Sequence, residues 1–192
     1  MINPAKAVEI PNIGRVRPED ILRFVPTSTG TTTSGTFQMH FDGSDVSLTA
    51  KAEALDALAI DPSGRLIIST KGNALLKGVS QAIKDKNQDL LQFTFATTGD
   101  STSGGWAFWF DGSDVGLQKE NVDSLWIDPL NGDIYLSVVN NFNVGGVSGN
   151  GGTIFVCDPG SLGDTTTCSY RPYWDATAAG LSGNVTSLFI QR

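Results

Sequence analysis

The chain has 192 residues, of which 40% are hydrophobic and 17% charged, as in globular domains. Its formal net charge is −7. Nucleic-acid binding needs clustered Lys and Arg side chains that displace counterions from phosphates, so this charge argues against a nucleic-acid partner. No run of about eighteen apolar residues is present, so no membrane span is predicted. We expect one domain that covers residues 1–192.

Short strand-forming runs alternate with turn-forming residues from the first apolar run onward. In chain order, the first four strands are predicted at 21–24, 37–41, 55–60 and 66–70. The segment "DPSG" at 61–64 has the chemistry of a tight turn, because Pro presets φ and Gly accepts positive φ. The third and fourth strands should therefore form a hairpin.

The same pattern then returns, which marks an internal repeat. The octapeptide "FDGSDVSL" at 41–48 recurs as "FDGSDVGL" at 110–117, and "WDATAAGL" at 174–181 is a divergent third copy. Likewise, "NVDSLWI" at 121–127 is matched by "NVTSLFI" at 184–190. These matches divide the chain into unit one (about 18–86), unit two (87–149) and unit three (150–192 together with 1–17).

Four short strands per unit predict an all-β, β-propeller-like fold of three four-stranded blades. Because propellers have four to eight blades, three blades do not close a ring. Either two copies complete a ring as a homo-oligomer that fills the open blade, or the chain is part of a longer protein. The alternative fold is a pseudo-threefold, β-trefoil-like barrel.

The repeated segments carry a family resemblance. "FDGSDVGL" (110–117), "GRLIIST" (64–70) and "GVSG" (146–149) are similar to segments repeated in tandem in a group of secreted bacterial proteins. The resemblance implies propeller-like repeats and an extracellular or cell-surface location, and it implies no particular reaction. The first ten residues lack the charged start and the apolar run of a secretory signal.

Acidic residues gather around the octapeptide. If the loops around it emerge on one face, they bring together the carboxylates of Asp42, Asp45, Glu53, Asp56, Asp111, Asp114, Glu120 and Asp123, with Asp20 and Asp89 nearby. Oxygen ligands without His or Cys suit Ca²⁺, so one hypothesis is a calcium site in these loops. The alternative is that Asp42 and Asp111 cap their own turns, with Gly43 and Gly112 at positive φ.

Unit three is an internal control for the calcium hypothesis. It keeps an acidic residue, Asp175, at the first position of the loop. However, it has Ala178 and Thr186 where units one and two have aspartates. A metal ion should therefore bind units one and two and not unit three.

The two cysteines of the chain, Cys157 and Cys168, both lie in unit three. They flank a predicted hairpin loop, which favours a disulfide over two free thiols. A disulfide would indicate an oxidising compartment. The alternative of two free thiols would leave the compartment undefined.

No catalytic motif is found in the sequence. The one histidine, His40, lies in a predicted strand without a nucleophile motif such as G-x-S-x-G. We therefore expect a non-enzymatic extracellular repeat module, with or without calcium, that binds a protein or glycan ligand. Two alternatives stay open: a propeller hydrolase that acts on a carbohydrate or lactone through a carboxylate and metal site, and a self-assembling structural subunit.

Overall fold

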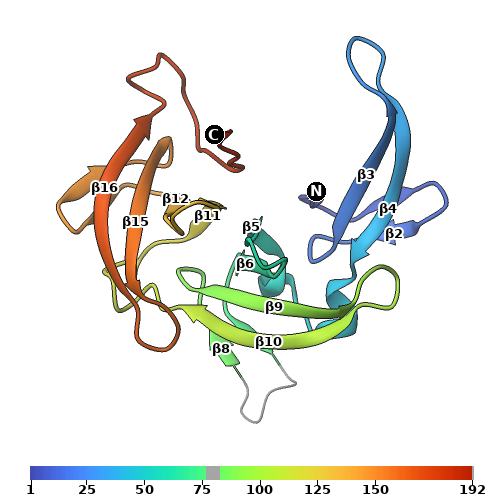
Figure 1. Cartoon of the computed structure of the whole chain (residues 1–192), viewed down its shortest axis with the longest axis horizontal. Coiled ribbons are helices and arrows are strands. Elements are labelled where there is room, and N and C mark those ends of the chain that lie inside the picture. Colours follow the sequence, from blue (N-terminus) through green and yellow to red (C-terminus); the bar gives the residue numbers. More distant parts are fainter. Residues whose placement is uncertain (77–82, 192) are drawn as a thin grey trace.

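The structure is a computed structural model, and it describes residues 1–76 and 83–191. Within these residues the chain is all-β (Figure 1). The strands are β1 (Val8–Ile10), β2 (Gly14–Val16), β3 (Ile21–Ser28), β4 (Ser34–Phe41), β5 (Leu55–Ile60), β6 (Leu66–Thr70), β7 (Ala74–Leu76), β8 (Ile83–Asp85), β9 (Leu90–Thr97), β10 (Ser103–Phe110), β11 (Val122–Ile127), β12 (Ile134–Val138), β13 (Phe142–Val144), β14 (Val147–Gly149), β15 (Thr153–Ser161) and β16 (Thr167–Asp175). Two 3-10 turns, η1 (Gly43–Val46) and η2 (Lys51–Glu53), follow β4.

The larger sheets are antiparallel and combine strands from successive repeat units. One four-stranded sheet has the order β5-β6-β9-β10, and the other has the order β11-β12-β15-β16. The expectation of one four-stranded sheet per unit is therefore wrong in its phase. The third and fourth strands of one unit pair with the first two strands of the next unit. Among the described residues the sheets remain separate and do not close into a barrel.

The β3–β4 hairpin stands where a third large sheet would begin. It is a two-stranded sheet, and Ile2 adds one isolated antiparallel bridge to Leu22. The backbone N–H groups of Ile2 and Leu22 donate to each other's carbonyl oxygens at 2.9 and 2.8 Å. Figure 1 shows β5 and β11 near the centre of the molecule, with β10 and β16 farther out.

The hairpin between β5 and β6 follows from its sequence. Strand β5 alternates buried and half-buried residues, whereas every residue of β6 is buried. A fully buried strand is covered on both faces, as expected in the interior of a sheet stack. Between the two strands, Asp61 accepts hydrogen bonds from the N–H groups of Ser63 and Arg65, and Gly64 has a φ of 81°. The predicted hairpin is confirmed.

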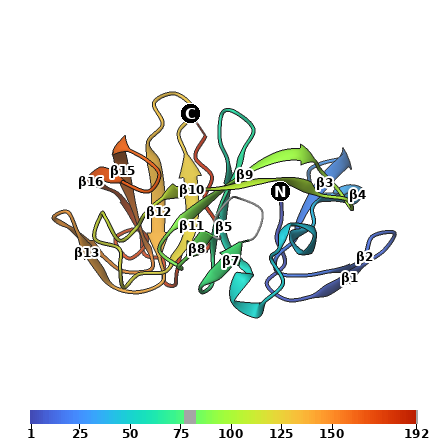
Figure 2. The ribbon, with the colours of Figure 1, turned by 90° about the horizontal axis from the view of Figure 1, so that it is seen from below.

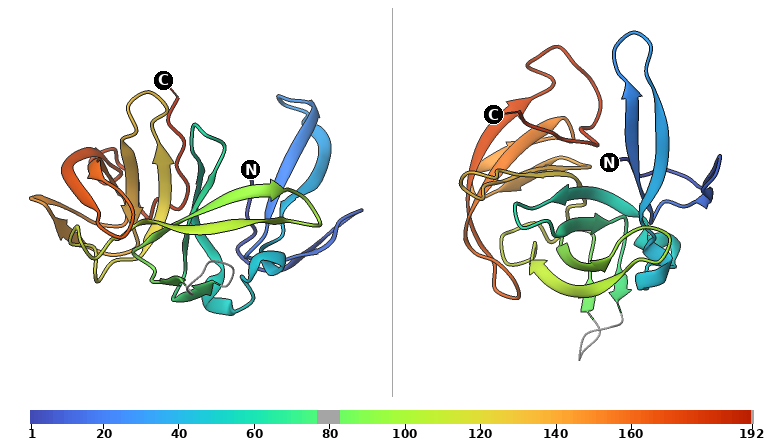
Figure 3. Two further views of the ribbon diagram at one scale, coloured as in Figure 1. Left: turned by 60° about the horizontal axis from the view of Figure 1, so that its bottom comes forward. Right: turned by 45° about the vertical axis from the view of Figure 1, so that its right-hand side comes forward.

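Two apolar cores lie between neighbouring sheets. Phe41, Leu66 and Trp106 belong to the core between the β3–β4 hairpin and the first large sheet. Phe110 and Phe155 belong to the core between the two large sheets. Figures 2 and 3 show the hairpin and the two sheets standing in succession. Each fully buried Leu or Phe side chain contributes about 1.5–3 kcal/mol, so these cores hold the succession together.

One diagonal position distinguishes the three hairpins β3–β4, β9–β10 and β15–β16. In the first two, a phenylalanine ring covers a glycine of the neighbouring strand, in the pairs Phe24–Gly35 and Phe93–Gly104. A Cβ atom on either glycine would overlap that ring. By ladder register, the equivalent positions in the third hairpin are Cys157 and Cys168, which form a disulfide. The predicted disulfide is confirmed, and it is consistent with an oxidising compartment.

Candidate functional site

The repeated octapeptide forms a capped turn in units one and two. We call residues 42–47 and 111–116 the acidic loops. In the first loop, Asp42 Oδ1 accepts hydrogen bonds from the N–H and the hydroxyl of Ser44, at 3.0 and 2.6 Å. Asp111 accepts the same pair of bonds from Ser113, at 2.8 and 2.5 Å. The interpretation that these two aspartates cap their own turns is confirmed.

The glycines of the acidic loops serve close approach and not positive φ. The left-handed residues are Ser47 in the first loop, with a φ of 80°, and Gly116 in the second, with a φ of 91°. A Cβ atom at Gly43 would instead overlap the carbonyl oxygen of Glu19, and one at Gly112 would overlap that of Gln88. The expected role of these glycines is thus corrected.

Unit three meets the same steric demand in a different way. Ala176 stands where the acidic loops have glycine, and the facing residue is Gly152. The N–H of Ala176 donates to the carbonyl oxygen of Gly152 at 3.0 Å. In unit three the glycine therefore lies on the facing backbone and not in the loop, and the two backbones still approach each other closely.

Each acidic loop also receives the hairpin of the next unit. We call residues 28–34, 97–103 and 161–167 the hairpin tips. The Thr102 N–H, in the second tip, donates to Asp45 Oδ2 at 2.9 Å. The Thr102 hydroxyl oxygen accepts from the Asp42 N–H at 2.9 Å, and the Gly99 N–H donates to the His40 carbonyl at 3.0 Å. Three hydrogen bonds therefore hold this tip of unit two on unit one.

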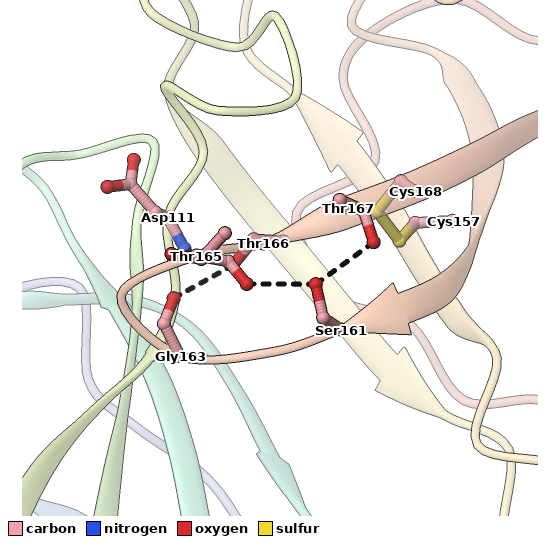
Figure 4. Close-up of a disulfide and its surroundings, with 8 residues drawn as sticks. All are labelled: Asp111, Cys157, Ser161, Gly163, Thr165, Thr166, Thr167 and Cys168. Atoms are coloured by element: carbon pink, nitrogen blue, oxygen red, sulfur yellow. Dashed lines mark hydrogen bonds between the residues drawn. A yellow bond between two sulfur atoms is a disulfide. The ribbon is translucent and has the colours of Figure 1, made fainter.

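The third tip docks onto the second acidic loop with the same contacts, and Figure 4 shows Asp111 of this loop beside Thr166 of the tip. The Thr166 N–H donates to Asp114 Oδ2 at 3.0 Å, and its hydroxyl oxygen accepts from the Asp111 N–H at 2.9 Å. The Gly163 N–H donates to the Trp109 carbonyl at 2.8 Å. Sequence reasoning missed these threonines and glycines. The signal was present, because all three tips carry Gly followed three residues later by Thr.

Asp20 and Asp89 lie close to the acidic loops, as predicted. Each carboxyl accepts one hydrogen bond from the N–H of a loop glycine, Gly43 or Gly112, at 3.0 Å. Burial raises the pKa of both carboxyls, and for Asp89 it does so to about 6, because the charged form loses hydration. Hydrogen bonds from backbone N–H groups oppose this rise. These two aspartates, which precede β3 and β9, therefore connect the start of each strand to its acidic loop.

The two glutamates of the calcium hypothesis differ in their partners. Glu53 Oε2 accepts from the N–H groups of Thr49 and Ala50, both at 2.7 Å. The corresponding connection in unit two is two residues shorter. Glu120 Oε2 is buried without a hydrogen-bond partner among the described atoms, and burial raises its pKa. The shorter connection leaves this carboxylate without the backbone donors that Glu53 has.

Asp56 and Asp123 lie on the inner strands β5 and β11, away from the turns. Asp56 Oδ2 accepts from the side-chain amide of Asn121 at 2.8 Å, and Asp123 Oδ1 accepts from the Ser137 hydroxyl at 2.7 Å. Asp123 is only 3% exposed. Burial, helped by the negative charge of Asp56, raises the pKa of Asp123 to about 6, against the hydrogen bond from Ser137.

The eight predicted calcium ligands are thus distributed over different contacts. Among the described residues, no three His, Cys, Asp or Glu side chains form a group that could hold a metal ion. The first aspartate of each acidic loop caps a turn and the second binds a hairpin tip, whereas Asp56 and Asp123 lie outside the loops, on inner strands. The spacing in the sequence did not reveal that these aspartates point to different neighbours.

A cavity of about 660 Å³ lies where the inner strands converge. It is lined by corresponding segments of all three units, residues 56–60 of β5, 124–126 of β11 and 186–189 near the C-terminal end, together with residues 1–3. Ala59, Trp126 and Phe189 occupy equivalent places in these three segments. Among the described lining residues, Asp56 is the one acidic side chain. A hydrolytic site with two carboxylates would require a second acid facing this cavity.

Comparison with known proteins adds no relative. No protein-family model, curated protein or solved structure matches the chain. In the described part of the chain, no helix has the length and apolar character needed to cross a bilayer.

Proposed function

We propose that this chain is a non-enzymatic, extracellular binding module built as an arc of propeller-like sheets, and that its ligand occupies the cavity between the inner strands. The observation that carries the proposal is that all three repeat units contribute equivalent segments to one cavity. Ligand sites are concave, mostly apolar and equipped with a few polar groups. The disulfide between Cys157 and Cys168 supports an extracellular setting.

The lining of the cavity favours a carbohydrate as the ligand class. Trp126 is half-buried and lines the cavity, so its ring can pack against the apolar face of a sugar. Asn3 and Asp56 also line the cavity, and their polar groups can bind hydroxyl groups. This combination of an aromatic face and a few hydrogen-bonding groups suits a neutral saccharide.

The acidic loops support a rigid frame for this cavity. Each loop ties its own turn and also holds the next hairpin, so successive sheets are fixed relative to one another. In this proposal the acids are used for the frame and not for catalysis. Such a frame positions the inner strands without closing over the cavity.

The test is a glycan microarray with the labelled wild-type chain, followed by calorimetric titration of the best neutral oligosaccharide. Two variants alter the cavity. Trp126→Ala removes the aromatic face, and Ala59→Trp fills the cavity with a side chain that the equivalent position of unit two already carries. We expect both variants to weaken binding at least tenfold, about the effect of losing 1.4 kcal/mol.

Trp109→Ala is the matched control. Trp109 is also half-buried but packs against the core between the large sheets and does not line the cavity. Its replacement should leave saccharide affinity within about twofold at a temperature where the variant is folded. Absence of saccharide binding in the wild type, or full affinity in Ala59→Trp, would contradict the proposal.

A further inference from the structure

The first hairpin tip, residues 28–34, is built like the two docked tips. The Ser28 hydroxyl donates to the Thr32 carbonyl, and the Thr33 hydroxyl donates to the Gly30 carbonyl, both at 3.2 Å. The docked tips have the same two bonds, from Thr97 and Thr102 in the second tip. Its glycine also has positive φ, at 114°, as in the other two tips. The docking conformation is therefore present before any partner binds.

This first tip has no acidic loop to dock on in the described part of the chain. All its residues are exposed, and its hydrogen bonds remain within the hairpin. By contrast, the equivalent threonines of the docked tips, Thr102 and Thr166, are 4% and 2% exposed. In Figures 1 and 3 the tip of the β3–β4 hairpin projects away from the rest of the molecule.

A matching acceptor is present in unit three. We call residues 175–180 the third loop. Asp175 caps it by accepting from the Thr177 N–H at 2.8 Å, as the acidic loops do. The Ala176 N–H donates to the Gly152 carbonyl, on the side of β15. In an antiparallel strand, successive N–H groups point to opposite sides, so the Asp175 N–H points to the open edge of β16. Two of the three docking groups are thus in place: this N–H and the Tyr173 carbonyl. The third is lost, because Ala178 replaces the second aspartate.

The residues near the N-terminus and the segment at 185–190 also match each other as neighbouring strands. By ladder register, Ile2 corresponds to Ile68, because each lies opposite the equivalent leucine of the next strand, Leu22 or Leu91. The inner partner of Ile68 is Leu58, and the residue equivalent to Leu58 in unit three is Leu188. Ile2 is 50% exposed. In the described part of the chain, the β3–β4 hairpin with Ile2 therefore has no inner strand beside it, and the segment at 185–190 has the pattern of one.

We propose that the first hairpin tip of one copy docks onto the third loop of a second copy of this chain. The Thr33 hydroxyl oxygen then accepts from the Asp175 N–H, and the Gly30 N–H donates to the Tyr173 carbonyl. In the same interface, Ile2 of one copy lies opposite Leu188 of the other. Two such contacts close a ring of two chains, because the same head-to-tail step is made twice. This association does not depend on a ligand in the cavity.

The first test is sedimentation velocity over a range of protein concentrations. We expect a concentration-dependent monomer–dimer equilibrium for the wild type and a shift to monomer for Thr33→Trp, which blocks docking. Thr31→Trp is the matched control on the same tip, because the equivalent residues of the docked tips, Asp100 and Asp164, remain exposed. It should dimerise like the wild type.

The second test restores the missing acceptor. Ala178→Asp gives the third loop the carboxylate that Asp45 and Asp114 supply elsewhere. A hydrogen bond to a charged group is stronger than one between neutral groups, so the dimer Kd should fall about tenfold or more. The effect should disappear in the double variant Ala178→Asp/Thr33→Trp.

The third test is a cross-link between two different chains. Among the described residues no free cysteine is present, so Ile2→Cys and Leu188→Cys can be prepared separately and mixed under oxidising conditions. Facing residues of paired strands lie within disulfide range, and the mixture should give a covalent heterodimer. A folded wild type and Ala178→Asp that stay monomeric, or a dimer that Thr33→Trp does not weaken, would overturn the proposal.

Discussion

The acidic loops of units one and two and the third loop occupy the same place in their units, yet they differ in one carboxylate. All three keep the first aspartate and its capped turn. The two loops that also receive a hairpin tip carry the second aspartate, and the third loop has Ala178. The comparison teaches that one octapeptide combines two separable tasks. The first aspartate forms the turn, and the second joins one unit to the next.

The largest expected effect concerns the close approach beneath the loop. Gly112→Val places side-chain atoms against the carbonyl of Gln88, which is backbone and cannot move aside, so we expect a loss of about 2–4 kcal/mol in the free energy of unfolding. Urea denaturation measures this loss. Gly105→Ala, where a Cβ atom meets open space, should change stability by less than about 1 kcal/mol.

The same steric rule can be tested by importing the arrangement of unit two into unit three. Gly152→Gln alone should destabilise the chain, because its side chain would meet Ala176. Adding Ala176→Gly should recover the part of the loss that the Ala176 contact causes, as a double-mutant cycle would report, whereas the contact with the Gly183 carbonyl oxygen would remain. Additive losses would show that the two positions are independent and would break the comparison.

The next effect concerns the diagonal pair that is phenylalanine and glycine in the first two hairpins and the Cys157–Cys168 disulfide in the third. Reduction of the Cys157–Cys168 disulfide releases a loop with a sequence separation of 11 residues. We therefore expect a loss of about 2–3 kcal/mol in the free energy of unfolding. The pair Cys157→Phe/Cys168→Gly copies the other hairpins. It should be more stable than Cys157→Ala/Cys168→Ala by thermal unfolding, and equal stability would argue that the aromatic packing is not transferable.

If docking stabilises the fold, a threonine of a docked tip should contribute more to the free energy of unfolding than the equivalent threonine of the exposed tip. Thr166→Val removes a buried hydroxyl that accepts from Asp111 and donates to Gly163, and we expect a loss of about 1–3 kcal/mol. Thr33→Val alters the exposed tip, so in dilute protein its effect should stay within about 0.5 kcal/mol. Equal losses from chemical denaturation would mean that docking does not contribute to stability.

The inner strands offer a smaller, pH-dependent difference between units two and three. Asp123 is buried with a pKa raised to about 6, whereas unit three has Thr186 at this position. The folded state therefore binds the proton more tightly than the unfolded state, and this group's contribution to stability falls as pH rises from about 4 to 6 and stays low above. Asp123→Asn should flatten this part of the stability profile, while the exposed Asp175→Asn should not.

The smallest expected effect is that of a chelator. Because the carboxylates of the acidic loops are engaged by backbone N–H groups, excess EDTA should leave the melting temperature unchanged. A fall that added Ca²⁺ reverses, and that is absent in Asp45→Ala/Asp114→Ala, would instead support metal binding. Differential scanning calorimetry in calcium-free buffer separates the two outcomes.

The local features of this protein can be predicted from its amino-acid sequence. Apolar alternation and turn residues identify β5, β6 and the turn between them, and an aspartate followed by Gly-Ser predicts a capped turn at Asp42 and Asp111. The spacing of Cys157 and Cys168 predicts their disulfide. These features depend on residues that are neighbours along the chain, and local backbone chemistry is enough to specify them.

The repeat that supplies the partner strands and the direction of each carboxylate depend on long-range packing. The sheets join halves of successive units, because a hairpin buries more apolar surface against the next inner strands than it can bury alone. Asp45 and Asp56 are close in sequence, yet one binds Thr102 and the other binds Asn121. Such contacts link residues more than fifty positions apart, and no local pattern records them.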